Sequence, residues 1–254
     1  MYPDLFSIGP LTVHTYGVFV AIGFLAGIFV ATRTGKKTGI DPNRVLDMGF
    51  MIIVCGIIGS RAAYILINFS HYAAYPKDIL KLWQGGLVFS GGLVLVVIAA
   101  VWYSRHHGYN IWTIGDLWAP AAAIGQAIGR IGCFFAGCCY GKPGDLPWCV
   151  VFSNPKSLAT LNVPLHPTQL YSSLGSFLIF IVLLILQKKK KFEGQVFLWF
   201  LILHSTARLI LEKYRGDARG VIITNDFSTT QLIALIILIA AVTALFFFRP
   251  SNKQ

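Results

Sequence analysis

Two arginines lie inside long apolar runs of the sequence, where a positive charge needs a partner. Arg130 is the second residue of the stretch GRIGCFFAGCCYG, residues 129–141, and Arg208 lies near the end of a later apolar run. A charge at membrane depth costs several kcal/mol unless it is paired or solvated, so both residues are candidates for a functional site. A guanidinium fork binds two oxygens at once, which favours a phosphate ligand. The alternative for Arg130 is a side chain that extends to the membrane interface.

The second arginine belongs to a regular polar pattern. His204, Arg208, Glu212 and Arg215 recur at i, i+4, i+8 and i+11, which predicts one stripe on a helix. Two arginines would then share one glutamate, and the surplus positive charge would suit an anion. The alternative is a simple ladder of ion pairs at the interface.

Three further polar stretches lie near the expected membrane boundary. Trp83-Gln-Gly-Gly-Leu-Val-Phe-Ser90-Gly91-Gly92 carries two Gly-Gly pairs, which weaken a helix and indicate either close helix packing or backbone approach to a headgroup. Tyr16-Gly17 opens the first apolar run, and His166-Pro-Thr-Gln169-Leu-Tyr171 opens the fifth. We expect all of these features on the outer side of the membrane, and this convergence predicts a site there.

The elements that must position these residues are membrane helices. The 254 residues are 56% hydrophobic and 12% charged, with a mean hydropathy of +0.67, whereas soluble domains carry about a quarter charged residues. Apolar runs near 20 residues predict an all-α polytopic bundle, and no short alternating segments indicate a β-barrel. We expect a single integral membrane domain over 1–254, with seven transmembrane spans. The predicted spans are 12–32, 46–68, 86–104, 117–137, 168–187, 195–212 and 229–248.

Charge patterning predicts the orientation. The loops after the first, third and fifth spans and the C-terminal tail carry more Lys and Arg than the opposite side, which places the N-terminus outside and the C-terminus in the cytoplasm. The start has no basic region or cleavage site typical of a signal peptide. Much of the net charge of +11 is explained by anchors beside anionic lipid headgroups, and no motif indicates nucleic-acid binding.

Five motifs occur in the order found in prolipoprotein diacylglyceryl transferases, and the chain resembles this family over about residues 5–248. The motifs are Tyr16-Gly17, Trp83-Gln-Gly-Gly…Gly91-Gly92, Gly129-Arg130-Ile131-Gly132-x-Phe134, His166-Pro-Thr-Gln-Leu-Tyr171 and Arg208-x-x-x-Glu212-x-x-Arg215.

The resemblance implies an enzyme of the bacterial cytoplasmic (inner) membrane that acts on lipoproteins. The diacylglyceryl group of phosphatidylglycerol would pass to the lipobox cysteine thiol at the signal peptide of a prolipoprotein, and glycerol phosphate would leave. Arg130 and Arg208 would bind the phosphate, with Glu212 and Arg215 in support and Tyr16 close by. Membrane lipids would be its surroundings, and we expect no cofactor. The further substrate-binding candidates are Gly91, Gly92, Gly141, Gln169 and Tyr171.

The chain departs from the family pattern at positions that could carry acid–base chemistry. Ser90 stands where the family usually has a histidine, and His204 stands where a tyrosine is expected. Cys133 and Ala136 replace two asparagines, Cys138 replaces a glutamate, and Ser172 replaces an acidic residue. The leading hypothesis is a divergent transferase in which His204 is the base, so His204, Ser90 and Tyr16 are the catalytic candidates.

Other functions remain as alternatives. The chain could be a paralogue that binds the same phospholipid but uses another acceptor, or that is inactive. A rhomboid-like serine protease built on Ser90 and His204 would leave the arginines without a task. A small transporter or lipid-binding scaffold is the non-enzymatic alternative, although no internal repeat supports a transporter.

Four of the five cysteines, Cys133, Cys138, Cys139 and Cys149, fall within 17 positions, and Cys55 lies apart. Their spacing lacks a second ligand pair, so we expect no metal site. A disulfide from Cys138 or Cys139 to Cys149 is one alternative, and simple packing is another. A catalytic thiol would need a depressed pKa, which nearby Arg130 could provide.

Overall fold

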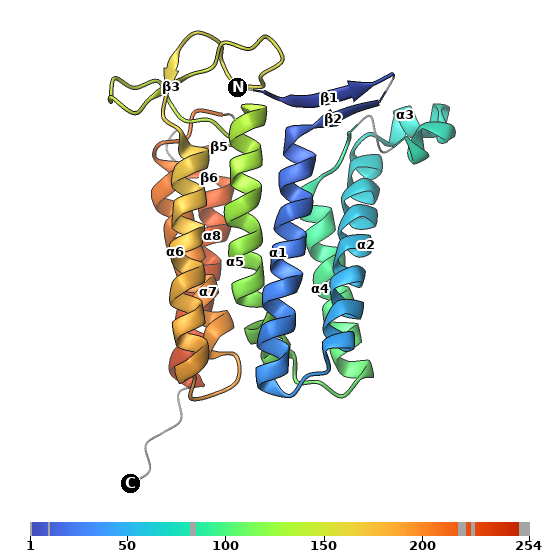
Figure 1. The fold of residues 1–254 in the computed structure, drawn as a ribbon, viewed down its shortest axis with the longest axis vertical. Helices are drawn as coiled ribbons and strands as arrows, with labels where there is room; N and C mark the ends of the chain where they lie inside the picture. Colours follow the sequence, from blue (N-terminus) through green and yellow to red (C-terminus); the bar gives the residue numbers. More distant parts are fainter. Residues whose placement is uncertain (1, 10, 82–84, 218–221, 225–226, 249–254) are drawn as a thin grey trace. The chain divides into compact units, whose positions relative to one another are not determined.

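The structure is a computed structural model that describes residues 2–9, 11–81, 85–217, 222–224 and 227–248 (Figure 1). Seven helices in these ranges are long and apolar enough to cross a membrane, which confirms the predicted all-α polytopic class. They are α1 (Thr15–Thr38), α2 (Pro42–Ile67), α4 (Phe89–His106), α5 (Ile111–Ala136), α6 (Thr168–Lys189), α7 (Gln195–Glu212) and α8 (Thr229–Phe247). The remaining helices are short: α3 (Phe69–Ala74) and the 3-10 helix η1 (Pro76–Leu80).

Strands in the described ranges form three antiparallel pairs. The pairs are β1 (Asp4–Ile8) with β2 (Leu11–His14), β3 (Val150–Val151) with β4 (Pro164–Leu165), and β5 (Ile222–Thr224) with β6 (Phe227–Ser228). The first two pairs lie at the end where α5 ends and where α1 and α6 begin (Figure 1). They therefore cover one end of the helices that carry the candidate site.

Two helices extend beyond the apolar runs that predicted them. Helix α1 continues to Thr38 through Lys36 and Lys37, and α5 begins at Ile111, before the predicted start at 117. Hydropathy detects only the apolar part of a helix, whereas capping and backbone hydrogen bonds extend the helix into polar sequence. At the start of α5, the side chain of Asn110 accepts a hydrogen bond from the amide of Trp112 at 3.0 Å.

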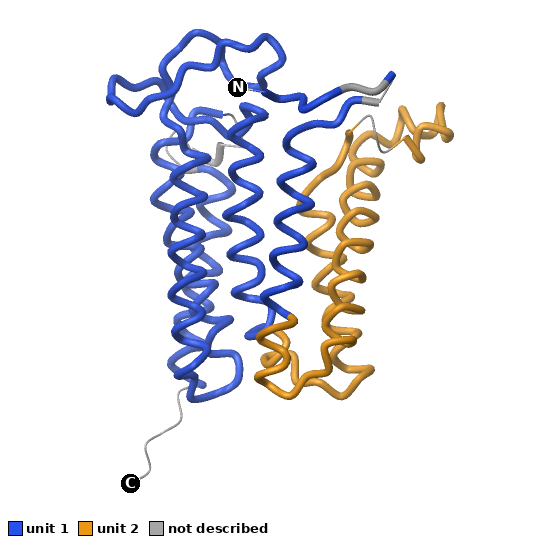
Figure 2. The backbone as a smooth tube through the Cα atoms, viewed as in Figure 1, with its two compact units in different colours: residues 1–31, 115–254 blue, residues 32–114 orange. Residues whose placement is uncertain are grey.

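The chain forms two compact units (Figure 2). Unit 1 comprises residues 1–31 and 115–254, and unit 2 comprises residues 32–114. In unit 1, α1 and α5 cross closely at small residues. A Cβ on Gly23 would lie 2.8 Å from the carbonyl oxygen of Gly125, and one on Gly132 would lie 2.8 Å from Cβ of Phe19. Backbone contact at this crossing holds the start of α1 against the end of α5.

A buried carboxylate sets the start of α7 in unit 1. Asp116 on α5 is fully buried and accepts hydrogen bonds from the amides of Gly194 and Phe197, each at 2.9 Å. Lys190 lies 3.4 Å from the same carboxylate. A helix N-terminus exposes unpaired N–H groups and carries partial positive charge, so a carboxylate is a suitable cap. Asp116 thus fixes α7, the helix that carries His204 and Arg208, from outside that helix.

In unit 2, glycines let α2 and α4 approach at backbone distance. A Cβ on Gly91 would meet Cβ of Ala63 and would lie 2.5 Å from the carbonyl oxygen of Gly59. A Cβ on Gly92 would meet the hydroxyl of Ser60. The Gly-Gly pair of α4 therefore has a packing role in this unit.

Candidate functional site

The end of α7 carries a largely buried ion pair. Nη2 of Arg208 lies 2.9 Å from Oε2 of Glu212, and their side chains are only 14% and 11% exposed. The other carboxylate oxygen accepts a hydrogen bond from the hydroxyl of Ser228 at 2.9 Å. Ser228 is the N-cap of α8 and forms a capping box with Gln231. The guanidinium of Arg208 is therefore positioned through Glu212 by the start of a second helix.

The expectation that Arg208 and Arg215 share Glu212 on one helical stripe is wrong. Helix α7 ends at Glu212, and Arg215 lies in the following turn, where it forms a β-bridge with Gly141. Its guanidinium pairs with Asp217 at 2.9 Å. Although burial alone would lower it, the hydrogen bonds to Asp217 and Cys139 raise the pKa of Arg215. Each of the two arginines thus has its own carboxylate.

The two predicted phosphate ligands both lie near His204 in unit 1. Arg130 on α5 and Arg208 on α7 are both charged neighbours of His204, close enough to interact electrostatically with its ring. Arg130 is also a charged neighbour of Tyr16, which the close crossing of α1 and α5 places beside it, because Gly132 contacts the backbone of Tyr16. Four of the sequence-predicted residues therefore gather around one cationic centre.

Gly141 lies where three segments of unit 1 cross. Its amide donates to the carbonyl of His166 at 3.0 Å, and the next amide, that of Lys142, donates to the carbonyl of Tyr214 at 2.8 Å. A Cβ at position 141 would lie 2.6 Å from the carbonyl oxygen of His166. Any larger residue would separate the segments that carry His166 and Arg215. The contacts of Gly141 are thus structural, and its assignment to substrate binding stays a prediction.

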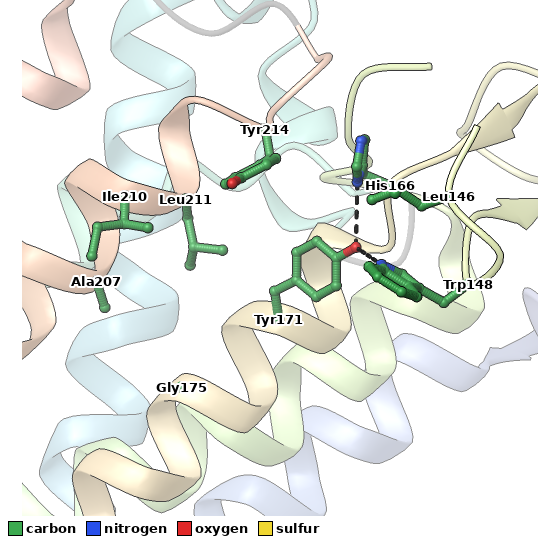
Figure 3. Close-up of a pocket in the computed structure, with 9 residues that line it drawn as sticks. All are labelled: Leu146, Trp148, His166, Tyr171, Gly175, Ala207, Ile210, Leu211 and Tyr214. Atoms are coloured by element: carbon green, nitrogen blue, oxygen red, sulfur yellow. Dashed lines mark hydrogen bonds between the residues drawn. The ribbon is translucent and has the colours of Figure 1, made fainter. Parts of the chain in front are cut away.

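A pocket of about 520 Å³ opens between α6 and α7, with an aromatic rim and aliphatic walls (Figure 3). At the rim, the hydroxyl of Tyr171 accepts a hydrogen bond from Nε1 of Trp148 at 2.7 Å and lies 3.3 Å from Nδ1 of His166. Helix α7 contributes Ala207, the residue that precedes Arg208 in the sequence (Figure 3). The further lining residues are Leu146, Gly175, Ile210, Leu211 and Tyr214.

The first turn of α6 holds the segment that follows α5. The hydroxyl of Thr168 donates to the carbonyl of Cys139 at 2.7 Å, and Nε2 of Gln169 donates to the carbonyl of Cys138 at 2.8 Å. The amide oxygen of Gln169 is buried and has no hydrogen-bond partner among the residues that the structure describes. A buried oxygen without a hydrogen-bond partner is unusual, and Gln169 can therefore accept a hydrogen bond from a ligand.

None of the five cysteines, all of which lie in the described ranges, forms a disulfide, so the disulfide alternative is wrong for this structure. The sulfur atoms of Cys133, Cys138 and Cys139 instead lie within 4.8 Å of one another, a grouping that their spacing did not predict. Hydrogen bonds with Cys133 and Cys139, together with burial, raise the pKa of the Cys138 thiol. A raised pKa is the reverse of what an unassisted catalytic thiol at position 138 requires.

Unit 2 contains the remaining candidates. Ser90 is the exposed second residue of α4, and the contacts of Gly91 and Gly92 with α2 account for both glycines by packing. Their assignments to catalysis and substrate binding stay predictions. Trp83 and Gln84 of the same motif lie outside the described residues.

Sequence reasoning missed two charged residues that the structure shows to be important. Arg61, buried within α2, donates to the carbonyls of Asp78 at 2.6 Å and Gly85 at 2.8 Å, and so anchors the segment that precedes α4. Asp116 caps the start of α7. The signal for both was present, since Arg61 lies inside the predicted span 46–68 and Asp116 immediately precedes the span at 117–137.

Comparison with known proteins agrees with the motifs. Residues 3–247 match the model of the family described as prolipoprotein diacylglyceryl transferase. A relative from Clostridium tetani, named phosphatidylglycerol–prolipoprotein diacylglyceryl transferase, is 36% identical over 95% of this chain and 96% of its own length. A relative of the same name from Bacillus velezensis is 31% identical over 97% of this chain and 92% of its own.

These matches extend over nearly the whole chain, including all seven membrane helices and the positions of both arginines. They confirm the resemblance that the five motifs indicated, and the enzymatic class that it implied. The chain belongs to the prolipoprotein diacylglyceryl transferase family.

Proposed function

We propose that the chain transfers the diacylglyceryl group of phosphatidylglycerol to the lipobox cysteine thiol of a prolipoprotein. The thiolate attacks the diacylglyceryl carbon that carries the phosphate oxygen. A carbon–sulfur bond forms, the carbon–oxygen bond breaks, and its electron pair leaves on glycerol phosphate. The names of the relatives support both substrates. The reaction needs a cation for the leaving phosphate and a base for the thiol.

The observation that carries this proposal is the pair of arginines around His204. Arg130 and Arg208 are both charged neighbours of that ring, and Glu212 holds the guanidinium of Arg208. Negative charge grows on the phosphate as the carbon–oxygen bond breaks, and a fixed guanidinium stabilises it without reorganisation. Arg130 and Arg208 then bind the phosphate, and Glu212 positions one of them.

His204 is the candidate base for the acceptor thiol. An imidazole can take a proton near neutral pH, and the thiolate is the reactive form of cysteine. Both arginines act electrostatically on its ring, so a phosphate bound by them would have a proton acceptor nearby. Tyr16, a neighbour of Arg130, is a further hydrogen-bonding group at this centre.

The pocket between α6 and α7 suits the acyl chains of the phospholipid. Ala207 and Leu211 line the pocket from the helix that also carries Arg208. A phospholipid whose headgroup is bound at Arg208 would therefore have an apolar surface nearby for its acyl chains. The hydrogen-bonded rim of Tyr171, Trp148 and His166 marks the polar end of this pocket. Gln169, with its unpartnered amide oxygen, is a candidate donor-binding group nearby.

The proposed location is the bacterial cytoplasmic (inner) membrane, with the N-terminus outside and the C-terminus in the cytoplasm. The excess of Lys and Arg in the loops after the first, third and fifth spans supports this orientation. In that orientation the end of α5, the end of α7 and the start of α6 face the outer leaflet, where exported prolipoproteins arrive.

The test is rescue of a bacterial strain depleted of its own transferase, followed by lipoprotein lipidation. The unchanged chain is expected to restore lipidation, and Arg130→Lys and Arg208→Lys are expected to reduce it strongly, because lysine lacks the planar fork. Arg105→Lys, at an exposed arginine of α4, is the matched control and should rescue fully. Failure of the unchanged, membrane-inserted chain to restore any lipidation would overturn the proposal.

A further inference from the structure

Three cysteine thiols meet at the end of α5. The Sγ atoms of Cys133, Cys138 and Cys139 all lie within 4.8 Å of one another. Cys133 and Cys139 are each 8% exposed, and none of the three forms a disulfide. Packing alone does not require three sulfurs to converge, and two of the three side chains are shielded from solvent. The cluster therefore has the geometry of a ligand set.

The backbone is arranged to bring these thiols together. After α5 ends at Ala136, the chain reverses through Gly137, with φ of 76°, and Cys139, with φ of 63°. A non-glycine residue in the left-handed region is uncommon, so the position of Cys139 is imposed by its surroundings. The start of α6 supplies them, because Thr168 and Gln169 bind the carbonyls of Cys139 and Cys138. The cluster is thus held by a second helix.

We propose that Cys133, Cys138 and Cys139 form a three-thiolate site for a soft divalent metal ion of the zinc class. Zinc binds sulfur at about 2.3 Å, which places the sulfurs of a tetrahedral site about 3.8 Å apart. The present separations of up to 4.8 Å need a contraction of about 1 Å or less, which side-chain rotation can supply. Thiolate ligands select zinc-class ions over magnesium or calcium.

The surrounding charges suit the complex. Binding one divalent ion releases three protons and leaves a net charge of −1 on the site. Arg130 is a charged neighbour of Cys133, and the guanidinium of Arg215 is hydrogen-bonded to Cys139. Two arginines therefore flank the cluster and offset the negative charge of the metal–thiolate group. Without the thiolates, the two positive arginines would repel a metal cation.

A site with three protein ligands keeps one position open. A zinc-class ion in this site would lower the pKa of a coordinating thiol, so the acceptor cysteine would bind as the thiolate and its proton would pass to His204. Resting on the proposed function, the open position is assigned to the acceptor cysteine of the prolipoprotein. Tyr16 interacts electrostatically with all three cysteines and with Arg130, so the cluster adjoins the proposed phosphate site. The metal would then hold the sulfur close to the carbon that it attacks.

The first experiment measures metal binding by the purified full-length protein in detergent, reduced and without oxygen. Titration with Zn²⁺, and with Co²⁺ as a spectroscopic probe, is expected to give one ion per chain and sulfur-to-cobalt charge-transfer bands. Cys133→Ser, Cys138→Ser and Cys139→Ser are each expected to lose stoichiometric binding. Cys55→Ser and Cys149→Ser, outside the cluster, are the matched controls and should retain it.

The cobalt spectrum of the unchanged protein reports thiolate ligands directly, so the result does not depend on variants that fold poorly. Binding of less than one ion per chain, a spectrum without thiolate bands, or binding that survives all three cluster substitutions would overturn the metal site. A disulfide among the three cysteines in the protein isolated without reductant would also overturn it.

The second experiment adds a lipobox cysteine peptide to the cobalt-loaded protein without phosphatidylglycerol. We expect a further thiolate band with the cysteine peptide and none with its serine counterpart. An unchanged spectrum would overturn the assignment of the open position. These readouts do not need turnover, so a protein that binds metal but transfers no lipid would contradict the proposed function and leave the site in place.

Discussion

Replacement of Glu212 by glutamine tests how Arg208 is held. Glutamine has the same shape and keeps an oxygen for the hydroxyl of Ser228, but it removes the negative charge that lies 2.9 Å from the guanidinium of Arg208. Breaking a buried ion pair costs about 3–5 kcal/mol, because the remaining charge stays desolvated. The two side chains retain 14% and 11% exposure, which favours the lower end of that range.

The expected loss of stability for Glu212→Gln is therefore about 3 kcal/mol. For a chain of this size such a loss lowers the melting temperature by about 6–12 °C. The effect on turnover is expected to be larger than that on substrate affinity. Removal of a donor that stabilises a transition state typically lowers kcat about 10²–10³-fold. Because Arg208 is still present but no longer held, we expect a fall of about 10–100-fold.

The assay combines thermal unfolding in detergent with steady-state transfer from phosphatidylglycerol to a lipobox peptide. Glu193→Gln, at an exposed glutamate just before α7, is the matched control and should change neither value. A Glu212→Gln protein with an unchanged melting temperature and full kcat would refute the role given to this ion pair.

Three further predictions concern contacts that stabilise the fold. Asp116→Asn removes a charge that accepts hydrogen bonds from two backbone amides, so we expect about 2–4 kcal/mol of destabilisation in an unfolding assay. Asp47→Asn, on the exposed surface of α2, is the control and should be neutral. Equal melting temperatures of the two variants would contradict the capping role of Asp116. Gly91→Ala forces a methyl group against the backbone of Gly59 and should lower stability by about 1–3 kcal/mol. Gly129→Ala should be neutral or stabilising, because a Cβ there would meet no described atom within 4 Å beyond its own stretch of helix. Equal effects of the two substitutions would refute the packing account. Hydrogen bonds from Lys156 and His14 lower the pKa of Asp4 below its usual 3.8. The link between strand β1 and Lys156 is therefore present above pH 3.8 and is lost as the pH falls through the lowered pKa, where hydrogen exchange of β1 should accelerate. The same acceleration in an Asp4→Asn protein would count against this link.

The membrane helices were predictable because an apolar run near 20 residues has few other stable forms. The span 195–212 coincides with α7, and the pairing of Arg208 with Glu212 follows from i, i+4 spacing on that helix. Arg215 was misplaced because the helix stops at Glu212, where the bridge between Gly141 and Arg215 competes with a further helical turn. A pairing between segments about 70 residues apart leaves no trace in helical periodicity.

The cysteine cluster could not be predicted for a related reason. Ligand spacing assumes regular local structure, whereas Cys138 and Cys139 reach Cys133 through a reversal with two residues at positive φ. The hydrogen bonds from Thr168 and Gln169 that hold this reversal come from a helix about 30 residues later. Asp116 was missed because it caps α7 from another helix, and cap signals in a sequence are read only next to the helix itself.

The central claim is that two arginines around His204 promote transfer of a diacylglyceryl group to a thiol. It is tested most directly by quantifying both products of the purified protein with phosphatidylglycerol and a lipobox cysteine peptide. The account predicts equal amounts of thioether peptide and glycerol phosphate, no product with a serine peptide, and a large fall in both products for Arg208→Lys. Release of glycerol phosphate without thioether, or undiminished transfer by Arg208→Lys, would contradict it.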